Sequence, residues 1–227
     1  ALLSARAGYY GLINHLDDQM NRLLNNVDGV QQMTDGNTAV IMTADHGEML
    51  GDHYCWRKSL PYEGAARIPL LVSLPERLGA GTNQVLDQPV GLEDIMPTIL
   101  DLAGIDVPDS VDGRSLLPLL RGEGGAESTW RADIHIEHGQ QTGFHALTDG
   151  KEKYIWFTAD GREQLFDLER DPAECRNLAA ASECQESLKQ WRQRMIEELR
   201  ERPEGFTDGE VLISGQPYPG LTPKVDD

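Results

Sequence analysis

Apolar residues recur along the chain with two different periods, which predicts helices at both ends and strands between them. Over residues 4–27 they return every three or four positions, as in an amphipathic helix. This stripe consists of Tyr9, Leu12, Ile13, Leu16, Met20, Leu23, Leu24 and Val27. A second stripe of the same period, in residues 183–201, consists of Leu188, Trp191, Met195 and Leu199. We therefore expect a helix in each segment.

Continuous apolar runs predict strands of a buried sheet. Residues 38–43 and 69–74 are short and apolar, like strands of a parallel sheet that is covered on both faces. Residues 90–103 have helical spacing, and Pro97 fits that helix only in its first turn, where a missing N–H costs little. We expect an α/β fold in which residues 1–122 form part of a mainly parallel sheet flanked by helices.

A shift in composition at Gly122-Glu123-Gly124-Gly125 predicts a boundary between two parts of the chain. Beyond it lie four strand candidates, residues 133–137, 144–148, 152–157 and 164–168. Turn sequences such as Asp149-Gly150 and Asp160-Gly161 separate them, as in antiparallel hairpins. Residues 123–227 are therefore expected to form a smaller subdomain with an antiparallel sheet, the C-terminal helix and a tail rich in Gly and Pro.

Charge and cysteine usage exclude some classes of protein. The chain has 38 acidic and 20 basic residues, a net charge of −18, which argues against a nucleic-acid partner. No apolar run reaches the roughly 18 residues of a membrane span. Cys175 and Cys184 could bridge or stay free, so cysteine usage defines no compartment. Ala1 begins within a helical pattern, so we expect the chain to be part of a longer protein.

The candidate chemistry follows the first strand, in Asp45-His46-Gly47. Ligands of open α/β sheets bind at the carboxyl ends of strands, and a carboxylate beside an imidazole can face one divalent cation. The same tripeptide also occurs as an ordinary turn, in which the Asp side chain bonds its own backbone. Lys58, twelve residues after His46, adds a positive charge suited to an anionic group.

A longer string around this tripeptide closely resembles the second signature region of type I sulfatases, members of the alkaline phosphatase-like superfamily. The string consists of Thr43–His53, Lys58, Tyr62-Glu63 and Arg67–Leu70. The resemblance is specific because many residues match the sulfatase signature at the same spacing. It covers essentially the whole chain, which resembles the C-terminal half of a sulfatase. The resemblance implies that Asp45 and His46 are the second pair of metal ligands, and that Lys58 binds the sulfate group.

The resemblance implies a sulfuric ester hydrolase with a formylglycine nucleophile and one divalent metal ion, for which Ca²⁺ is the first expectation. His46 stands where Asn is common, and imidazole suits transition metals better than calcium. The nucleophile is made from Cys or Ser in a C/S-x-P-x-R motif. Ser73–Arg77 fits that motif but follows the Asp-His-Gly region instead of preceding it, so we reject it. The chain is expected to need the remaining N-terminal half and to be inactive alone.

Four further residues are weaker candidates. His53 is a second catalytic candidate, and Arg57, His138 and His145 are candidates for substrate binding. Each could also be an ordinary polar residue in a loop or at a strand end. The expected partner is a small-molecule or glycan sulfate ester, and the sequence leaves its identity and the oligomeric state open.

Two alternatives remain. A phosphodiesterase or phosphonate monoester hydrolase of the same superfamily would bind Zn²⁺ or Mn²⁺, with His138 as a further ligand. Lys58 at its spacing from Tyr62-Glu63 and Arg67 favours the sulfatase. The other alternative is a catalytically inactive structural fragment, whose exposed apolar surface would favour aggregation.

Overall fold

The chain forms two compact units in a computed structural model that describes residues 1–25, 36–81, 83–123, 130–139 and 143–217. The first unit comprises Ala1–Lys58, Arg67–Leu86 and Leu92–Ser128, and the second comprises Ser59–Ala66, Asp87–Gly91 and Thr129–Asp227. The second unit thus includes two short segments from earlier in the chain. The Gly124-Gly125 pair of the predicted boundary lies outside the described residues.

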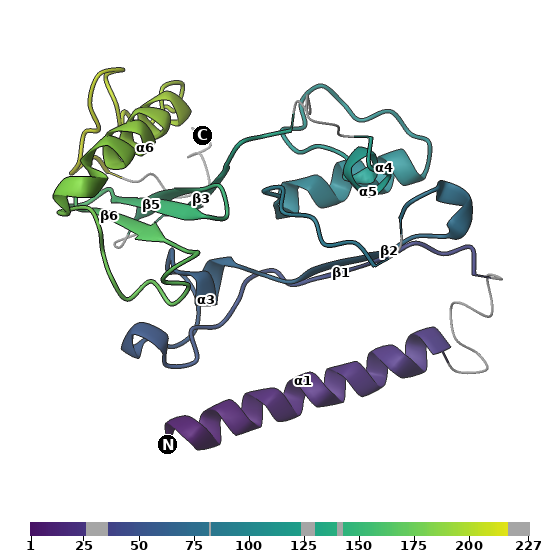
Figure 1. Ribbon diagram of the computed structural model, residues 1–227. Coiled ribbons are helices and arrows are strands. Elements are labelled where there is room, and N and C mark those ends of the chain that lie inside the picture. The colour runs from purple at the N-terminus through teal and green to yellow at the C-terminus, as the bar shows by residue number, and fades with distance from the viewer. Residues whose placement is uncertain (26–35, 82, 124–129, 140–142, 218–227) are drawn as a thin grey trace, which may run out of the picture. The chain divides into compact units, whose positions relative to one another are not determined.

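The first predicted helix is confirmed as α1 (Leu2–Asn25), the long purple helix of Figure 1. Residues 26 and 27 of the prediction lie outside the described residues. None of the residues of α1 is buried in the part of the chain that the structure describes, and the side chain of Leu12 is 69% exposed. The apolar stripe is therefore present but uncovered. Among the described residues, no helix is both long and apolar enough to cross a membrane.

The two predicted strands of the first unit form a two-stranded antiparallel sheet of β1 (Val40–Thr43) and β2 (Leu70–Ser73). Both sheets within the described ranges are antiparallel, so the expected parallel sheet is not seen there. An apolar run predicts a strand but carries no information about the direction of its neighbour. All residues of β1 are half-buried, while those of β2 alternate between half-buried and exposed.

Short helices complete the first unit. They are η1 (Asp52–Tyr54), η2 (Glu76–Leu78), η3 (Leu92–Asp94), α4 (Ile95–Leu102) and α5 (Leu117–Leu120). Pro97 lies in the first turn of α4, as expected. The buried Thr98 hydroxyl donates to the carbonyl of Asp94 at 2.6 Å and accepts from the backbone N–H of Leu116 at 2.9 Å. These bonds fix the residues before α5 against α4.

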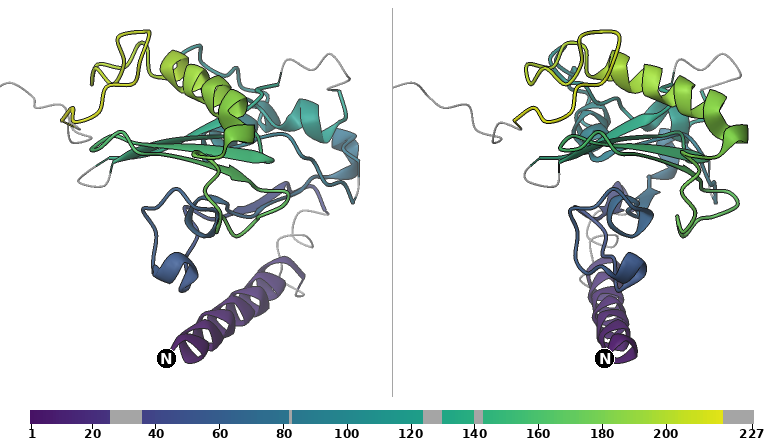
Figure 2. Two further views of the ribbon diagram at one scale, coloured as in Figure 1. Left: turned by 60° about the vertical axis from the view of Figure 1, so that its left-hand side comes forward. Right: turned by 90° about the vertical axis from the view of Figure 1, so that its left-hand side faces the viewer.

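The second unit contains the predicted antiparallel sheet and terminal helix. The sheet consists of β3 (Ile134–His138), β4 (Phe144–Thr148), β5 (Glu152–Phe157) and β6 (Glu163–Asp167), paired in sequence order. Short helices α3 (Glu63–Ala66) and η4 (Ser182–Cys184) belong to the same unit. Helix α6 (Gln185–Glu198) lies across one face of the sheet (Figure 2).

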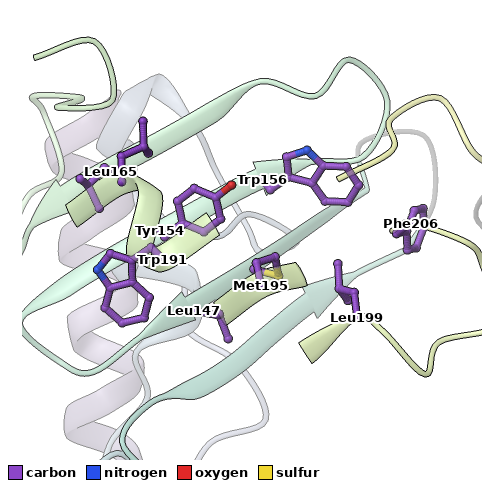
Figure 3. Close-up of a cluster of buried hydrophobic side chains, with 9 residues drawn as sticks. Leu147, Tyr154, Trp156, Leu165, Trp191, Met195, Leu199 and Phe206 are labelled. Carbon is purple, nitrogen blue, oxygen red and sulfur yellow. The ribbon is translucent and has the colours of Figure 1, made fainter. Parts of the chain in front are cut away.

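The sheet buries a core on each face because its side chains alternate. Tyr154 and Trp156 of β5 pack with Trp191 and Met195 of α6, and Phe206 covers one end of this cluster (Figure 3). The opposite face carries a smaller cluster, consisting of Phe144, Ala146, Ile155, Phe166 and Leu168. The two clusters hold β4 and β5 rigidly, so polar groups on these strands have fixed positions.

Candidate functional site

The candidate site begins two residues after β1, where the backbone turns at Asp45. The carboxylate Oδ1 of Asp45 accepts a hydrogen bond from the backbone N–H of His46 at 3.0 Å. Nδ1 of His46 lies 2.8 Å from the carbonyl oxygen of Gly47, so this nitrogen carries the proton and donates it. The other ring nitrogen, Nε2, is left with a lone pair that can accept a hydrogen bond or bind a metal.

Three predicted site residues meet at this nitrogen. Oδ2 of Asp45 lies 3.4 Å from His46 Nε2, and Nζ of Lys58 lies 2.9 Å from the same atom. The Asp45 side chain is 84% exposed and the His46 side chain 37%. The structure therefore brings a carboxylate, an imidazole and an ammonium group together at the surface of the first unit.

The loop that ends at Lys58 is closed by hydrogen bonds at its base. Oε1 of Glu48 accepts from the backbone N–H of Leu50 at 3.3 Å and from that of Arg57. The buried Met49 donates its backbone N–H to the carbonyl of Arg57 at 2.9 Å. These bonds fix the backbone immediately before the lysine.

The same loop contains an unusual number of left-handed residues that are not glycine. They are Leu50, His53, Tyr54 and Arg57, and Ser59, directly after the loop, is left-handed as well. Each such residue costs on the order of 1 kcal/mol, and the conformation persists only where the surroundings enforce it. Strain of this kind is concentrated at functional sites, so the backbone supports a functional role for this loop.

His53 and Arg57 lie on this loop but have different surroundings. His53 is half-buried in η1, and its carbonyl accepts from the free thiol of Cys55 at 3.3 Å. The side chain of Arg57 is exposed. Arg6 of α1 donates to the carboxylate of Asp52 at 2.8 Å, which ties the loop to that helix. The catalytic role of His53 and the substrate role of Arg57 stay predictions.

The donor atoms of Asp45 and His46 fit a divalent cation. A carboxylate oxygen and an imidazole lone pair 3.4 Å apart can face the same ion. Calcium requires about six to eight oxygen ligands, so these two residues would supply only part of its coordination sphere. The imidazole makes the pair equally suited to a transition metal.

The two histidines predicted in the second unit are less accessible. His138, at the end of β3, is half-buried and stacks on Phe144 with ring centroids 6.1 Å apart. His145 of β4 exposes no surface and packs against Trp156 and Phe206. Burial, with His135 nearby, lowers the pKa of His145 to about 4, so its ring is neutral at pH 7. In its own unit, His145 offers no surface to a substrate.

A buried ion cluster, which the sequence analysis missed, holds the segment after the loop that ends at Lys58. Lys153 of β5 exposes no surface, and its ammonium donates to Pro61 O at 3.0 Å, Glu63 Oε1 at 2.6 Å and Glu174 Oε1 at 2.9 Å. The cluster fixes the segment that begins directly after Lys58. The signal in the sequence was a lysine within the apolar run of β5, where strand alternation points it into the protein.

A known family matches most of the chain. The family model described as N-sulphoglucosamine sulphohydrolase, C-terminal, matches residues 51–202. This span includes Lys58 and all four strands of the second unit. The match therefore covers Lys58 and most of the loop before it, as well as the small antiparallel sheet.

Several known proteins are similar to the chain. An arylsulfatase from Clostridium perfringens is 43% identical over 224 residues, which cover 97% of this chain and 45% of the relative. A solved phosphonate monoester hydrolase from Silicibacter pomeroyi has a TM-score of 0.73 at 32% identity, covering 86% of this chain and 40% of that one. A structure in complex with its substrate, D-glucosamine-2-N,6-O-disulfate, has a TM-score of 0.69 at 24% identity, covering 83% and 39%. This chain thus spans less than half of each.

Proposed function

The chain belongs to the sulfatases of the alkaline phosphatase-like superfamily and corresponds to a C-terminal portion of its relatives, and from this premise we propose that the whole protein hydrolyses a sulfate ester. The observation that carries the proposal is the meeting of Asp45, His46 and Lys58 at one surface site. A metal ligand pair beside an ammonium group is suited to an anionic group such as sulfate.

We assign different roles to these residues. Sulfatases are typically metal-dependent, and Asp45 and His46 would hold the cation, which we propose to be Ca²⁺. When bound, the cation supplies Lewis-acid polarisation of the ester's oxygens. Lys58 stabilises the negative charge that develops on the transferring group, and the closed loop around it reduces the cost of positioning that charge.

The nucleophile is proposed to lie outside this chain. By resemblance it is a formylglycine in the remaining N-terminal half, so the chain alone is expected to be inactive. The internal Ser73–Arg77 match is a poor alternative, because Ser73 ends β2 and Arg77 donates to Asn37 at 2.5 Å. In the whole protein we propose that β1 and β2 belong to a larger, mainly parallel sheet.

The proposed substrate is a small sulfate ester or a sulfated glycan. The similar structure in complex with a disulfated glucosamine suggests the second class. Arg57, exposed beside Lys58, and His138 are proposed to contact the part of the substrate beyond the sulfate. His53 is proposed to assist catalysis from the same loop. We do not extend the substrate proposal to His145, because its side chain exposes no surface.

A second candidate is a phosphonate monoester hydrolase. The similarity to the enzyme from Silicibacter pomeroyi favours it, because its TM-score of 0.73 is accompanied by 32% identity. The metal content of the full-length protein separates the two candidates. Two zinc ions per active site would favour the phosphonate monoester hydrolase over the sulfatase. Faster turnover of an aryl phosphonate ester than of the matching aryl sulfate would favour the same candidate.

The first test is substitution of Lys58 in the full-length protein. Lys58→Ala should retain the metal but lower kcat for an aryl sulfate by on the order of a hundredfold, because it removes charge stabilisation in the transition state. Asp45→Ala should lose both metal and activity. Lys189→Ala, an exposed lysine on α6, is the matched control and should keep normal turnover. Near-normal kcat in the Lys58 variant would contradict its assignment.

A further inference from the structure

Three potential metal ligands meet in the second unit, outside the site described above. His135 and Glu137 of β3 and His145 of β4 offer ligand atoms that all lie within 4.8 Å of one another, and we call them the histidine cluster. Nε2 of His135 is 2.9 Å from Nδ1 of His145, and Oε2 of Glu137 is 3.6 Å from that Nδ1. The contacts define a compact group of two nitrogens and one oxygen.

The strand register explains why these atoms meet. Glu137 lies directly opposite His145 in the antiparallel ladder, and His135 stands two positions along β3 on the same face. The other side of His145 packs against Trp156 and Phe206, so its ring cannot turn away without opening the core. The ligand atoms are therefore held by regular strands, which position a site more accurately than loops do.

Neighbouring side chains orient the ligands. Nδ1 of His135 lies 3.2 Å from Oε1 of Glu198 on α6, so it donates there and its Nε2 faces the cluster with a lone pair. A carboxylate that accepts from the far nitrogen is the usual support for a metal-binding histidine. Arg202 donates to Oε2 of Glu137 at 2.8 Å, which holds this carboxylate beside the two histidines.

The charges around the cluster also favour a cation. The carboxylates of Glu137 and Glu204 contact the guanidinium of Arg202, and the carboxylate of Glu198 contacts His135. Three carboxylates around one guanidinium give this partly buried region an excess of negative charge, which is costly unless a cation compensates it. A divalent ion carries the matching charge.

We propose that the histidine cluster binds one Zn²⁺ ion through His135, His145 and Glu137. Two imidazoles and one carboxylate are ligands that zinc takes in proteins, with a fourth position left for water. Glu137 is 36% exposed and provides a route for the ion, while His145 is fully buried. The ion cross-links β3 to β4 and, through Glu198, secures the end of α6.

The test uses the full-length protein with Asp45→Asn and His46→Gln, which removes both residues of the candidate active site as zinc ligands. Zinc bound per chain is measured by mass spectrometry after dialysis, and affinity by calorimetry. We expect one zinc per chain. Adding His135→Gln should weaken zinc binding by at least about a hundredfold, and adding Glu198→Gln by roughly ten- to a hundredfold. His15→Gln, at an exposed position of α1, is the matched control and should leave binding unchanged.

Two results would overturn the proposal. One is the absence of bound zinc in the Asp45/His46 background, which would make the cluster a hydrogen-bonded charge network only. The other is zinc binding that neither His135→Gln nor Glu198→Gln weakens. Because Glu198 is 46% exposed and is not a ligand, its substitution tests the site even if the His135 variant fails to fold.

Discussion

Replacing Lys153 by methionine should destabilise the second unit far more than the loss of an exposed ion pair would. The Lys153 side chain exposes no surface, and three acceptors satisfy its three N–H groups. Glu174 is 2% exposed and Glu63 18%. Lys153→Met keeps most of the volume but leaves one buried and one half-buried carboxylate without their cation. Removal of one partner from a buried ion pair lowers the free energy of unfolding by about 3 to 5 kcal/mol, whereas an exposed pair contributes about 0 to 1 kcal/mol.

The loss should also depend on pH. Burial raises the pKa of Glu174 above its ordinary value of 4.5, and the Lys153 ammonium opposes that rise. Without the ammonium, the pKa of Glu174 should rise further. A carboxyl group whose pKa is raised by folding binds more protons when folded, so its contribution to stability is lost as pH rises from its unfolded pKa through its folded one. Lys153→Met should therefore be more destabilising at pH 8 than at pH 5.

Amide hydrogen exchange measures this loss locally, without requiring the whole chain to unfold cooperatively. Protection of the β5 amides in the chain should fall by at least on the order of a hundredfold at pH 8. Lys189→Met on the exposed side of α6 is the control and should change protection little. Adding Glu63→Gln and Glu174→Gln to Lys153→Met should restore part of the protection. A loss of less than about tenfold, or an equal loss at pH 5 and pH 8, would refute the reasoning.

Two further predictions concern association and catalysis. The isolated chain should self-associate or melt without a sharp transition, because the apolar residues of α1 are exposed, and Leu12→Glu should reduce the association seen by analytical ultracentrifugation. A monomeric chain with a sharp, reversible melt would contradict this. In the full-length protein, His53→Ala should lower kcat less than Lys58→Ala does, and unchanged kinetics would identify His53 as an ordinary loop residue.

The small antiparallel sheet could be predicted from the sequence because its signals are local. Turn pairs such as Asp149-Gly150 separate alternating strands, and the structure has the strands within one residue of the expected bounds. The arrangement of β1 and β2 could not be predicted in the same way. Their apolar runs indicate burial, but direction depends on which neighbour each strand finds, and that information is not local.

The polar clusters were missed for a related reason. His135 becomes a candidate ligand only through the register that places it near His145 and through the contact of Glu198 on α6, and no spacing in the sequence reveals either. Lys153 lies in an otherwise apolar strand, and its partners are 90 and 21 residues away. By contrast, the Asp45, His46 and Lys58 group was found because the resemblance fixes its spacing within one short segment.

The backbone before Lys58 and the backbone after it are each held by hydrogen bonds within their own unit, whereas Lys58 itself is exposed. On one side, the Glu48 carboxylate holds the loop through backbone N–H groups. On the other, Glu63 is bound by the buried ammonium of Lys153, and its backbone N–H donates to Glu174 at 2.6 Å. Because folding already fixes the backbone at Lys58, less conformational entropy is lost when its ammonium binds an anionic substrate. The role proposed for Lys58 explains why strained residues lie before it and why a buried ion cluster holds the segment after it.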